Sequence, residues 1–212
     1  MDGALPRLWL ITDPEHPGGP VGPLRRALAG NRRERVGVQL RAKNTSDRLV
    51  FDWGRELRAL THECGASLVV NGRADIAVRI GADGVHLGER GLSVSQARTL
   101  VPSSMRVGVS RHDRDGLVAA VDAGADYGFL SPVFEVPGKN GPLGVEGFAE
   151  AAHAIDMPVF GLGGLNAKNV GRLRTAGGFG AAVCRAVYRA EDPRREVDQC
   201  VVALDKLPAD AG

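Results

Sequence analysis

Gly81-Ala82-Asp83-Gly84-Val85-His86 lies in the middle of the chain, and its pattern returns further along the sequence. Gly124-Ala125-Asp126-Tyr127-Gly128-Phe129 repeats it closely, and Gly177-Gly178-Phe179-Gly180-Ala181-Ala182 repeats it more loosely. The first glycine of each copy can end a helix, because glycine accepts the left-handed conformation at that point. The residues that follow lead directly into an apolar run. Such short helix-to-strand connections, repeated along a chain, are typical of a parallel α/β fold.

Outward from these copies, short β-rich runs alternate with segments of helical periodicity. We expect strands at 9–12, 36–40, 68–70, 84–87, 107–109, 127–130, 159–162 and 180–183, and helices at 47–63, 93–100, 113–123, 146–155, 167–176 and 192–207. This alternation predicts an α/β fold, a single (βα)8 TIM barrel, with one domain over residues 1–212. An open doubly wound sheet uses similar connections and is the alternative.

Composition narrows the class of partner. The chain has 212 residues, 27 basic and 25 acidic, with no long block of one sign, so we expect neither nucleic acid nor a membrane as partner. The three cysteines, Cys64, Cys184 and Cys200, lack Cys-x-x-Cys spacing and favour a reducing, cytoplasmic location. The apolar run before Asp13 is too short for a signal peptide. A small molecule is the expected ligand.

Polar residues alternate at the end of the second expected strand. Gln39, Arg41 and Lys43 point to the same side if the strand continues through them. One amide, one guanidinium and one ammonium group then converge where the active site of a barrel lies, which predicts a phosphate or diphosphate site. A solvated polar strand edge is the alternative.

Other polar or glycine-rich segments follow the remaining strands. We expect His86 in either a structural or a catalytic role, and Asp75 and Asp113 as helix caps. The residues expected to contact substrate after strands three, five, seven and eight are Asn71, Ser110, Gly163, Gly164, Cys184, Arg185 and Ala186. Glycine permits close approach of an anion to backbone N–H groups, so the last two segments predict a phosphate cradle.

The longest connection runs over 131–145 and carries Glu135, Lys139 and Asn140. Long loops in compact domains are usually functional, so we expect a lid over the active site, with Gly138, Gly141 and Gly144 allowing movement. The alternative is a disordered insertion.

Taken in order, these segments resemble the thiamin phosphate synthase family over nearly the whole chain. The motifs are Gln39-Leu40-Arg41-Ala42-Lys43, Asn71-Gly72-Arg73-Ala74-Asp75-Ile76-Ala77, Gly81-Ala82-Asp83-Gly84-Val85-His86-Leu87-Gly88, Gly108-Val109-Ser110, Gly124-Ala125-Asp126-Tyr127, Ser131-Pro132-Val133-Phe134 and Gly161-Leu162-Gly163-Gly164. The synthases join a pyrimidine diphosphate to a thiazole phosphate, with magnesium holding the diphosphate. The resemblance implies that the diphosphate substrate is held by Gln39, Arg41, Lys43, Asn71 and Lys139.

The chain departs from the synthase pattern at the metal. The two aspartates that hold magnesium in synthases correspond here to Gly72 and Gly91, and glycine offers no side-chain oxygen. The lid threonines correspond to Val136 and Gly138, and a serine of the last strand to Arg185. Asn-Gly-Arg with a missing second aspartate looks like the paralogous TenI-type thiazole tautomerases, which need no metal.

We therefore expect a metal-independent, tautomerase-like enzyme that binds thiazole phosphate and needs no cofactor. Its proton shuttle would be Lys139, His112 or Glu135, because the histidine that some tautomerases carry in the lid is Pro132 here. The alternatives are a synthase, which would use magnesium, and a non-catalytic protein that binds thiamin precursors. Family analogy and the frequency of two-fold assemblies favour a homodimer.

Overall fold

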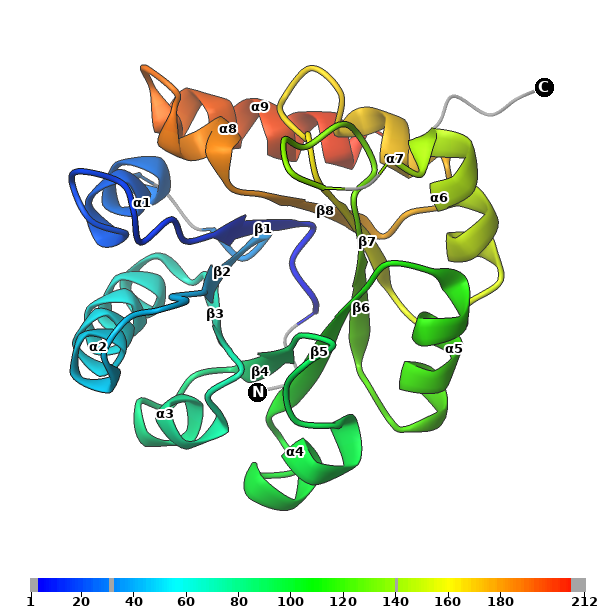
Figure 1. The fold of residues 1–212 in the computed structure, drawn as a ribbon. Helices are drawn as coiled ribbons and strands as arrows, with labels where there is room; N and C mark the ends of the chain where they lie inside the picture. Colours follow the sequence, from blue (N-terminus) through cyan, green and yellow to red (C-terminus); the bar gives the residue numbers. More distant parts are fainter. Residues whose placement is uncertain (1–3, 31–32, 140, 207–212) are drawn as a thin grey trace.

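The computed structural model describes residues 4–30, 33–139 and 141–206. Eight parallel strands form a closed barrel in which each strand pairs with its neighbour in the sequence and β1 pairs with β8 (Figure 1). The strands are β1 (Leu8–Ile11), β2 (Val36–Leu40), β3 (Ser67–Asn71), β4 (Gly84–Leu87), β5 (Arg106–Arg111), β6 (Tyr127–Leu130), β7 (Val159–Leu162) and β8 (Gly180–Val183). The predicted barrel is confirmed, and the open doubly wound alternative is wrong.

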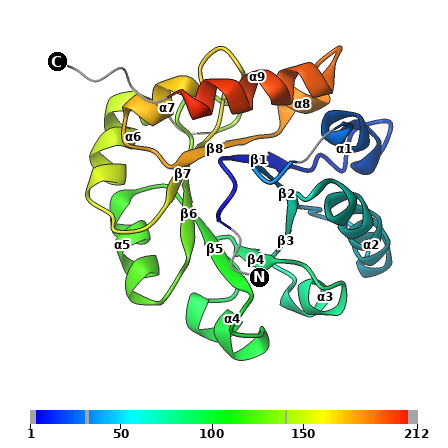
Figure 2. The same ribbon diagram turned by 180° about the vertical axis from the view of Figure 1, so that it is seen from behind.

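Helices follow the strands and form a ring around the barrel, seen from both sides in Figures 1 and 2. They are α1 (Val21–Leu28), α2 (Asp47–Cys64), α3 (Ala74–Arg79), α4 (Val94–Leu100), α5 (Arg114–Asp122), α6 (Gly144–His153), α7 (Gly171–Thr175), α8 (Arg185–Tyr188) and α9 (Pro193–Asp205). None of the helices in the described ranges is long and apolar enough to cross a membrane.

Several helix bounds differ from the sequence prediction, and α1, α3 and α8 are not among the predicted ranges. Helix α1 was not predicted, because Pro20, Gly22 and Pro23 are residues typical of loops; Pro23 nevertheless fits the first turn, where a missing N–H costs nothing. Helix α7 begins later than expected, since the Asn169 side chain instead accepts a hydrogen bond from Asn166 N at 2.9 Å in a local turn. The expected helix over 192–207 includes Leu207, which lies outside the described residues.

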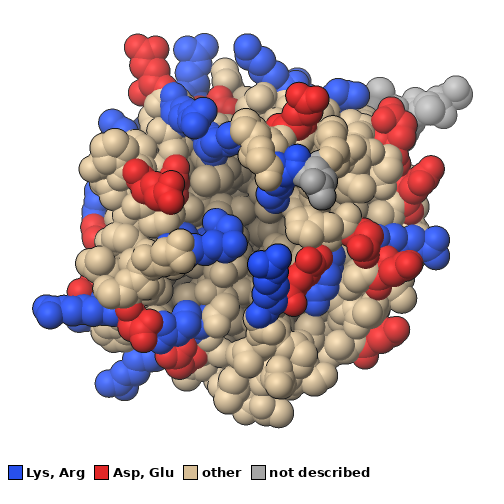
Figure 3. Space-filling view, viewed as in Figure 1, with Lys and Arg blue, Asp and Glu red and all other residues tan. Residues whose placement is uncertain are grey.

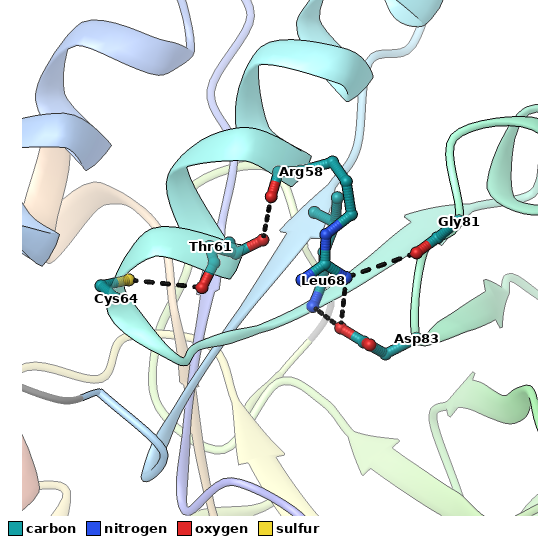
Figure 4. A network of polar contacts seen from close by, with 6 residues as sticks. All are labelled: Arg58, Thr61, Cys64, Leu68, Gly81 and Asp83. Carbon is teal, nitrogen blue, oxygen red and sulfur yellow. Dashed lines mark hydrogen bonds and ion pairs between the residues drawn. The ribbon is translucent and has the colours of Figure 1, made fainter. Parts of the chain in front are cut away.

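The repeated Gly-Ala-Asp segments have a structural role at the N-terminal ends of the strands (Figure 4). Asp83 Oδ2 accepts a hydrogen bond from Leu68 N at the start of β3 at 2.7 Å and pairs with Arg58 of α2 at 2.8 Å. Arg58 also donates to the carbonyl of Gly81. The aspartate therefore ties together a helix, the strand after it and the next helix-to-strand turn.

The second copy repeats this arrangement. Asp126 Oδ2 accepts from Val107 N of β5 at 2.5 Å and pairs with Arg98 of α4 at 2.7 Å, while Arg98 donates to Gly124 O. The third copy has no aspartate, and Arg174 donates to the carbonyl of Gly178 at 2.7 Å instead. The internal repeat is thus a repeated clamp at the end of the barrel opposite the expected active site.

The interior of the barrel is filled by aromatic side chains. Trp9 stacks on Tyr127 with ring centroids 5.4 Å apart and planes 10° apart, and Phe129 and Phe160 pack around them. Gly108 makes room for this packing, because a Cβ atom there would lie 2.1 Å from Tyr127 Cζ. The aromatic cluster closes the barrel and forms the floor beneath the polar side chains at the C-terminal strand ends.

Candidate functional site

An amide pair lies at the C-terminal ends of two adjacent strands. Gln39 of β2 is 2% exposed, and its Nε2 donates to Asn71 Oδ1 of β3 at 3.3 Å. The structure brings these two predicted residues together. Two side-chain amides fixed in this way offer donors and acceptors to the edge of a heteroaromatic ring.

Arg41 is anchored through its main chain. Arg41 N donates to Thr12 Oγ1 at 2.7 Å, and the Thr12 hydroxyl donates to the carbonyl of Arg41 at 2.9 Å. Thr12 is buried at the end of β1. This role of Thr12 was not predicted, because the residue was expected to be the last one of the strand at 9–12, whereas β1 ends at Ile11.

Three cationic side chains, Arg41, Lys43 and Lys139, lie close enough for the charges of the first two to act on the third. The pKa of Lys139 is lowered, first by partial desolvation of its ammonium and then by repulsion from Arg41 and Lys43. In the described part of the chain, no carboxylate lies within ion-pair distance of these three groups. Figure 3 shows Lys and Arg side chains around a hollow at the centre of this face. Such a cluster is suited to bind a multiply charged anion.

A buried histidine connects the aromatic floor to the site. His86 Nε2 lies 2.8 Å from Ser110 Oγ, and His86 Nδ1 lies 3.2 Å from Tyr127 Oη. Burial, with further contributions from Arg111 and Arg41, lowers the pKa of His86 to about 3, so its ring is neutral near pH 7. With Tyr127 donating to Nδ1, His86 donates to Ser110 and leaves the serine hydroxyl free to donate to a ligand.

The groups predicted to transfer protons do not form one cluster. His112 Nδ1 donates to the carbonyl of Ser131 at 2.5 Å, and its Nε2 lies 4.0 Å from Glu89 Oε2. Glu135 is exposed, and in the described ranges its side chain has no hydrogen-bond or ion-pair partner. Only Lys139 interacts with the cationic residues, and Asn140 lies outside the described residues.

The first part of the expected lid is pinned to β7. Val133 N donates to Leu162 O at 2.9 Å, and Phe134 N donates to Gly163 O at 3.1 Å. Gly163 has φ +104°, and a Cβ atom there would lie 2.9 Å from Pro132. The Gly163-Gly164 pair therefore lets the loop approach β7 closely, a packing role that the sequence alone could not separate from anion binding.

The segment after β8 begins the short helix α8. Cys184 precedes it, and Arg185 and Ala186 form its first positions. Burial, and next the charge of Asp13, raise the pKa of the Cys184 thiol to about 11, against the opposing effect of Arg41 and Arg185. The thiol is protonated near pH 7 and is a poor nucleophile.

The residues at the expected metal positions do not fit a magnesium ion. Gly72 has φ +70°, and neither it nor Gly91 offers a side-chain oxygen. Asp75 does not cap α3 as predicted, since the N-cap position is Arg73 and Asp75 pairs with that residue at 2.7 Å. Asp113 does cap α5, through Gly116 N at 2.7 Å. Within the described ranges, no three His, Cys, Asp or Glu side chains are grouped to hold a metal ion.

The fold and this site define a (βα)8 barrel that presents amide and cationic side chains at the C-terminal ends of its strands. A sequence family described as thiamine monophosphate synthase matches residues 8–187. The chain is therefore a member of the thiamine phosphate synthase family, as the motifs predicted.

Individual relatives agree with this family. A putative thiamine-phosphate synthase of Geobacter sulfurreducens is 41% identical over 93% of each chain, and the thiamine-phosphate synthase of Salinispora arenicola is 38% identical over 95% of this chain and 98% of that one. The thiamine phosphate pyrophosphorylase structure from Pyrococcus furiosus superposes with a TM-score of 0.85 at 31% identity, covering 94% of this chain and 95% of the other. These names favour the synthase over the tautomerase interpretation.

Proposed function

We propose that this chain is a thiamin phosphate synthase, which joins a pyrimidine diphosphate to a thiazole phosphate. The observation that carries this proposal is the cluster of Arg41, Lys43 and Lys139, of which the first two directly follow the strand that bears Gln39 of the Gln39–Asn71 amide pair. A tautomerase acting on a thiazole phosphate has no diphosphate to hold, so it has less need of three cations that have no acidic partner among the described residues. The names of the relatives support the same choice.

The proposed chemistry uses these groups as follows. The bond between the pyrimidine-bearing carbon and the diphosphate breaks, and that carbon becomes bonded to the thiazole. Negative charge grows on the departing diphosphate, where fixed positive side chains stabilise it more than they stabilise the bound substrate. Gln39 and Asn71 hold the pyrimidine ring, and Ser110 donates its hydroxyl to a ligand because His86 occupies its other side.

The test is formation of thiamin phosphate from both precursors by the purified protein. We expect turnover in the wild type and a loss of at least about tenfold in kcat/KM for Lys139→Gln, since a charge-assisted contact is removed. Lys168→Gln is the matched control, because Lys168 is an exposed lysine after β7 without a side-chain partner in the described residues. No product from the wild type would contradict the proposal.

A thiazole tautomerase is the second candidate, favoured by Gly72 and Gly91. In that case Lys139, His112 or Glu135 moves the proton, and conversion of carboxythiazole phosphate would appear with no pyrimidine substrate present. Unchanged turnover in both Lys139→Ala and His112→Ala would remove the first two from this role. Binding of precursors without turnover of any of them would favour the non-catalytic alternative.

The ligand class follows from the family, whose substrates are small phosphorylated molecules. Assembly as a homodimer and the cytoplasmic location stay predictions. Sedimentation equilibrium of the purified chain would test the first, and fractionation of the source cells would test the second.

A further inference from the structure

We infer that the site binds the diphosphate of its substrate directly through Arg41, Lys43 and Lys139, without a divalent cation. This rests on the proposed function, because only a synthase holds a diphosphate. Synthases of this family use magnesium to hold the diphosphate. Here the residues at the expected metal positions are glycines, which cannot bind magnesium through a side chain.

Within the described residues, the carboxylates near the mouth of the barrel are not grouped to hold a metal ion. Gly72 and Gly91 replace the two expected aspartates. Asp75 is held by Arg73, which also pairs with Asp47, and Glu89 lies beside His112. Moving any of these acids onto a shared metal ion would break contacts that the fold already makes.

The cationic side chains supply the charge that a metal would otherwise bring. Arg41 and Lys43 come from the end of β2, and Lys139 comes from the loop after β6, so they approach an anion from two sides of the mouth. Their mutual repulsion is unfavourable in the free protein. A diphosphate would neutralise it, because its negative charges replace a repulsive contact with charge-assisted hydrogen bonds.

Two further arginines reinforce the positive potential at this face. Arg111 lies close enough to contribute to the low pKa of His86, and its Nη1 donates to Ser110 O at 2.8 Å. Arg185 follows β8 where the resemblance leads one to expect a serine, and it acts on the Cys184 thiol together with Arg41. This face therefore carries positive side chains in addition to Arg41, Lys43 and Lys139.

Isothermal titration of the wild-type protein with inorganic pyrophosphate, in EDTA and separately in excess magnesium, tests the inference. We expect binding in EDTA that is equal to or tighter than binding in magnesium, because magnesium partly neutralises free pyrophosphate. Arg41→Gln and Lys139→Gln should each weaken binding about tenfold, whereas Lys168→Gln should not change it.

Binding that appears only with magnesium, or no binding under either condition, would overturn the inference. The titration uses neither organic precursor, so its outcome is separate from that of the proposed function. If the protein forms thiamin phosphate but binds pyrophosphate only with magnesium, the proposed function stands and the metal-free site is rejected. If it binds pyrophosphate without metal but forms no product, the metal-free site stands and the proposed function is rejected.

Discussion

Single residues in this site take their properties from burial. His86 would titrate near neutrality in water, but inside the barrel it is wholly buried between Tyr127 and Ser110 and two arginines act on it. A neutral ring donates from one nitrogen and accepts at the other, so burial gives His86 one donor and one acceptor between Tyr127 and Ser110.

The low pKa of His86 predicts acid sensitivity. Its pKa is about 3 in the folded protein and about 6.5 when unfolded, so between these values the unfolded chain binds the extra proton. The free energy of unfolding should therefore fall as the pH drops through this window, by about 1.4 kcal/mol per pH unit for this group. Urea denaturation of wild type and His86→Gln between pH 7 and pH 4.5 measures it.

His62→Gln is the control for this prediction, because His62 is exposed on α2. We expect the free energy of unfolding of the control to depend on pH as that of the wild type does. In His86→Gln this dependence should be weaker by the contribution of one proton. Equal slopes in all three proteins would contradict the assigned pKa.

At the scale of elements, the residues that stabilise the fold and the residues of the polar site lie at opposite ends of the strands. Asp83 and Asp126 act at the N-terminal ends of β3 and β5, whereas the polar site lies at the C-terminal ends. In barrels of this kind, residues at the N-terminal face serve the fold and residues at the opposite face serve the chemistry.

Asp126→Asn should therefore destabilise the protein without altering its chemistry. The amide oxygen can still accept from Val107 N, but the ion pair with Arg98 is lost, which costs roughly 1–3 kcal/mol. Thermal denaturation and kcat/KM measured on the same samples check both parts. Asp156→Asn, an exposed aspartate without a partner in the described residues, is the control. A large loss of kcat/KM at a temperature where the variant is folded would contradict this division.

The sequence predicted the elements better than the contacts between them. The β-rich runs and the glycines that end the helices marked every strand, because both signals are local. Helix α1 was missed because its prolines and glycine resemble a loop, and its burial against α9 is decided by tertiary contacts. The inward direction of His86 and its contact with Tyr127 depend on the closure of the barrel, which no spacing along the chain reveals.

At the scale of the whole molecule, charge is distributed unevenly although the net charge is only +2. The acidic residues named in the clamps pair with arginines around the outside, while Arg41, Lys43 and Lys139 at the mouth stay without acidic partners in the described part of the chain. A local positive potential therefore attracts anions despite the near balance of total charge.

Pyrophosphate affinity should accordingly depend on ionic strength. Raising sodium chloride from 50 to 500 mM should weaken binding by roughly tenfold, because salt screens exposed charges. The Lys139→Gln variant should show a shallower dependence than the wild type. Titrations at several salt concentrations measure both slopes, and parallel slopes would argue against a direct role for this lysine.

The aromatic floor formed by Trp9, Tyr127, Phe129 and Phe160 determines from which end a ligand can reach the site. These rings fill the centre of the barrel, so a ligand can reach the polar site only from the C-terminal ends of the strands. A ligand of the site therefore enters and leaves through the mouth at the C-terminal ends of the strands.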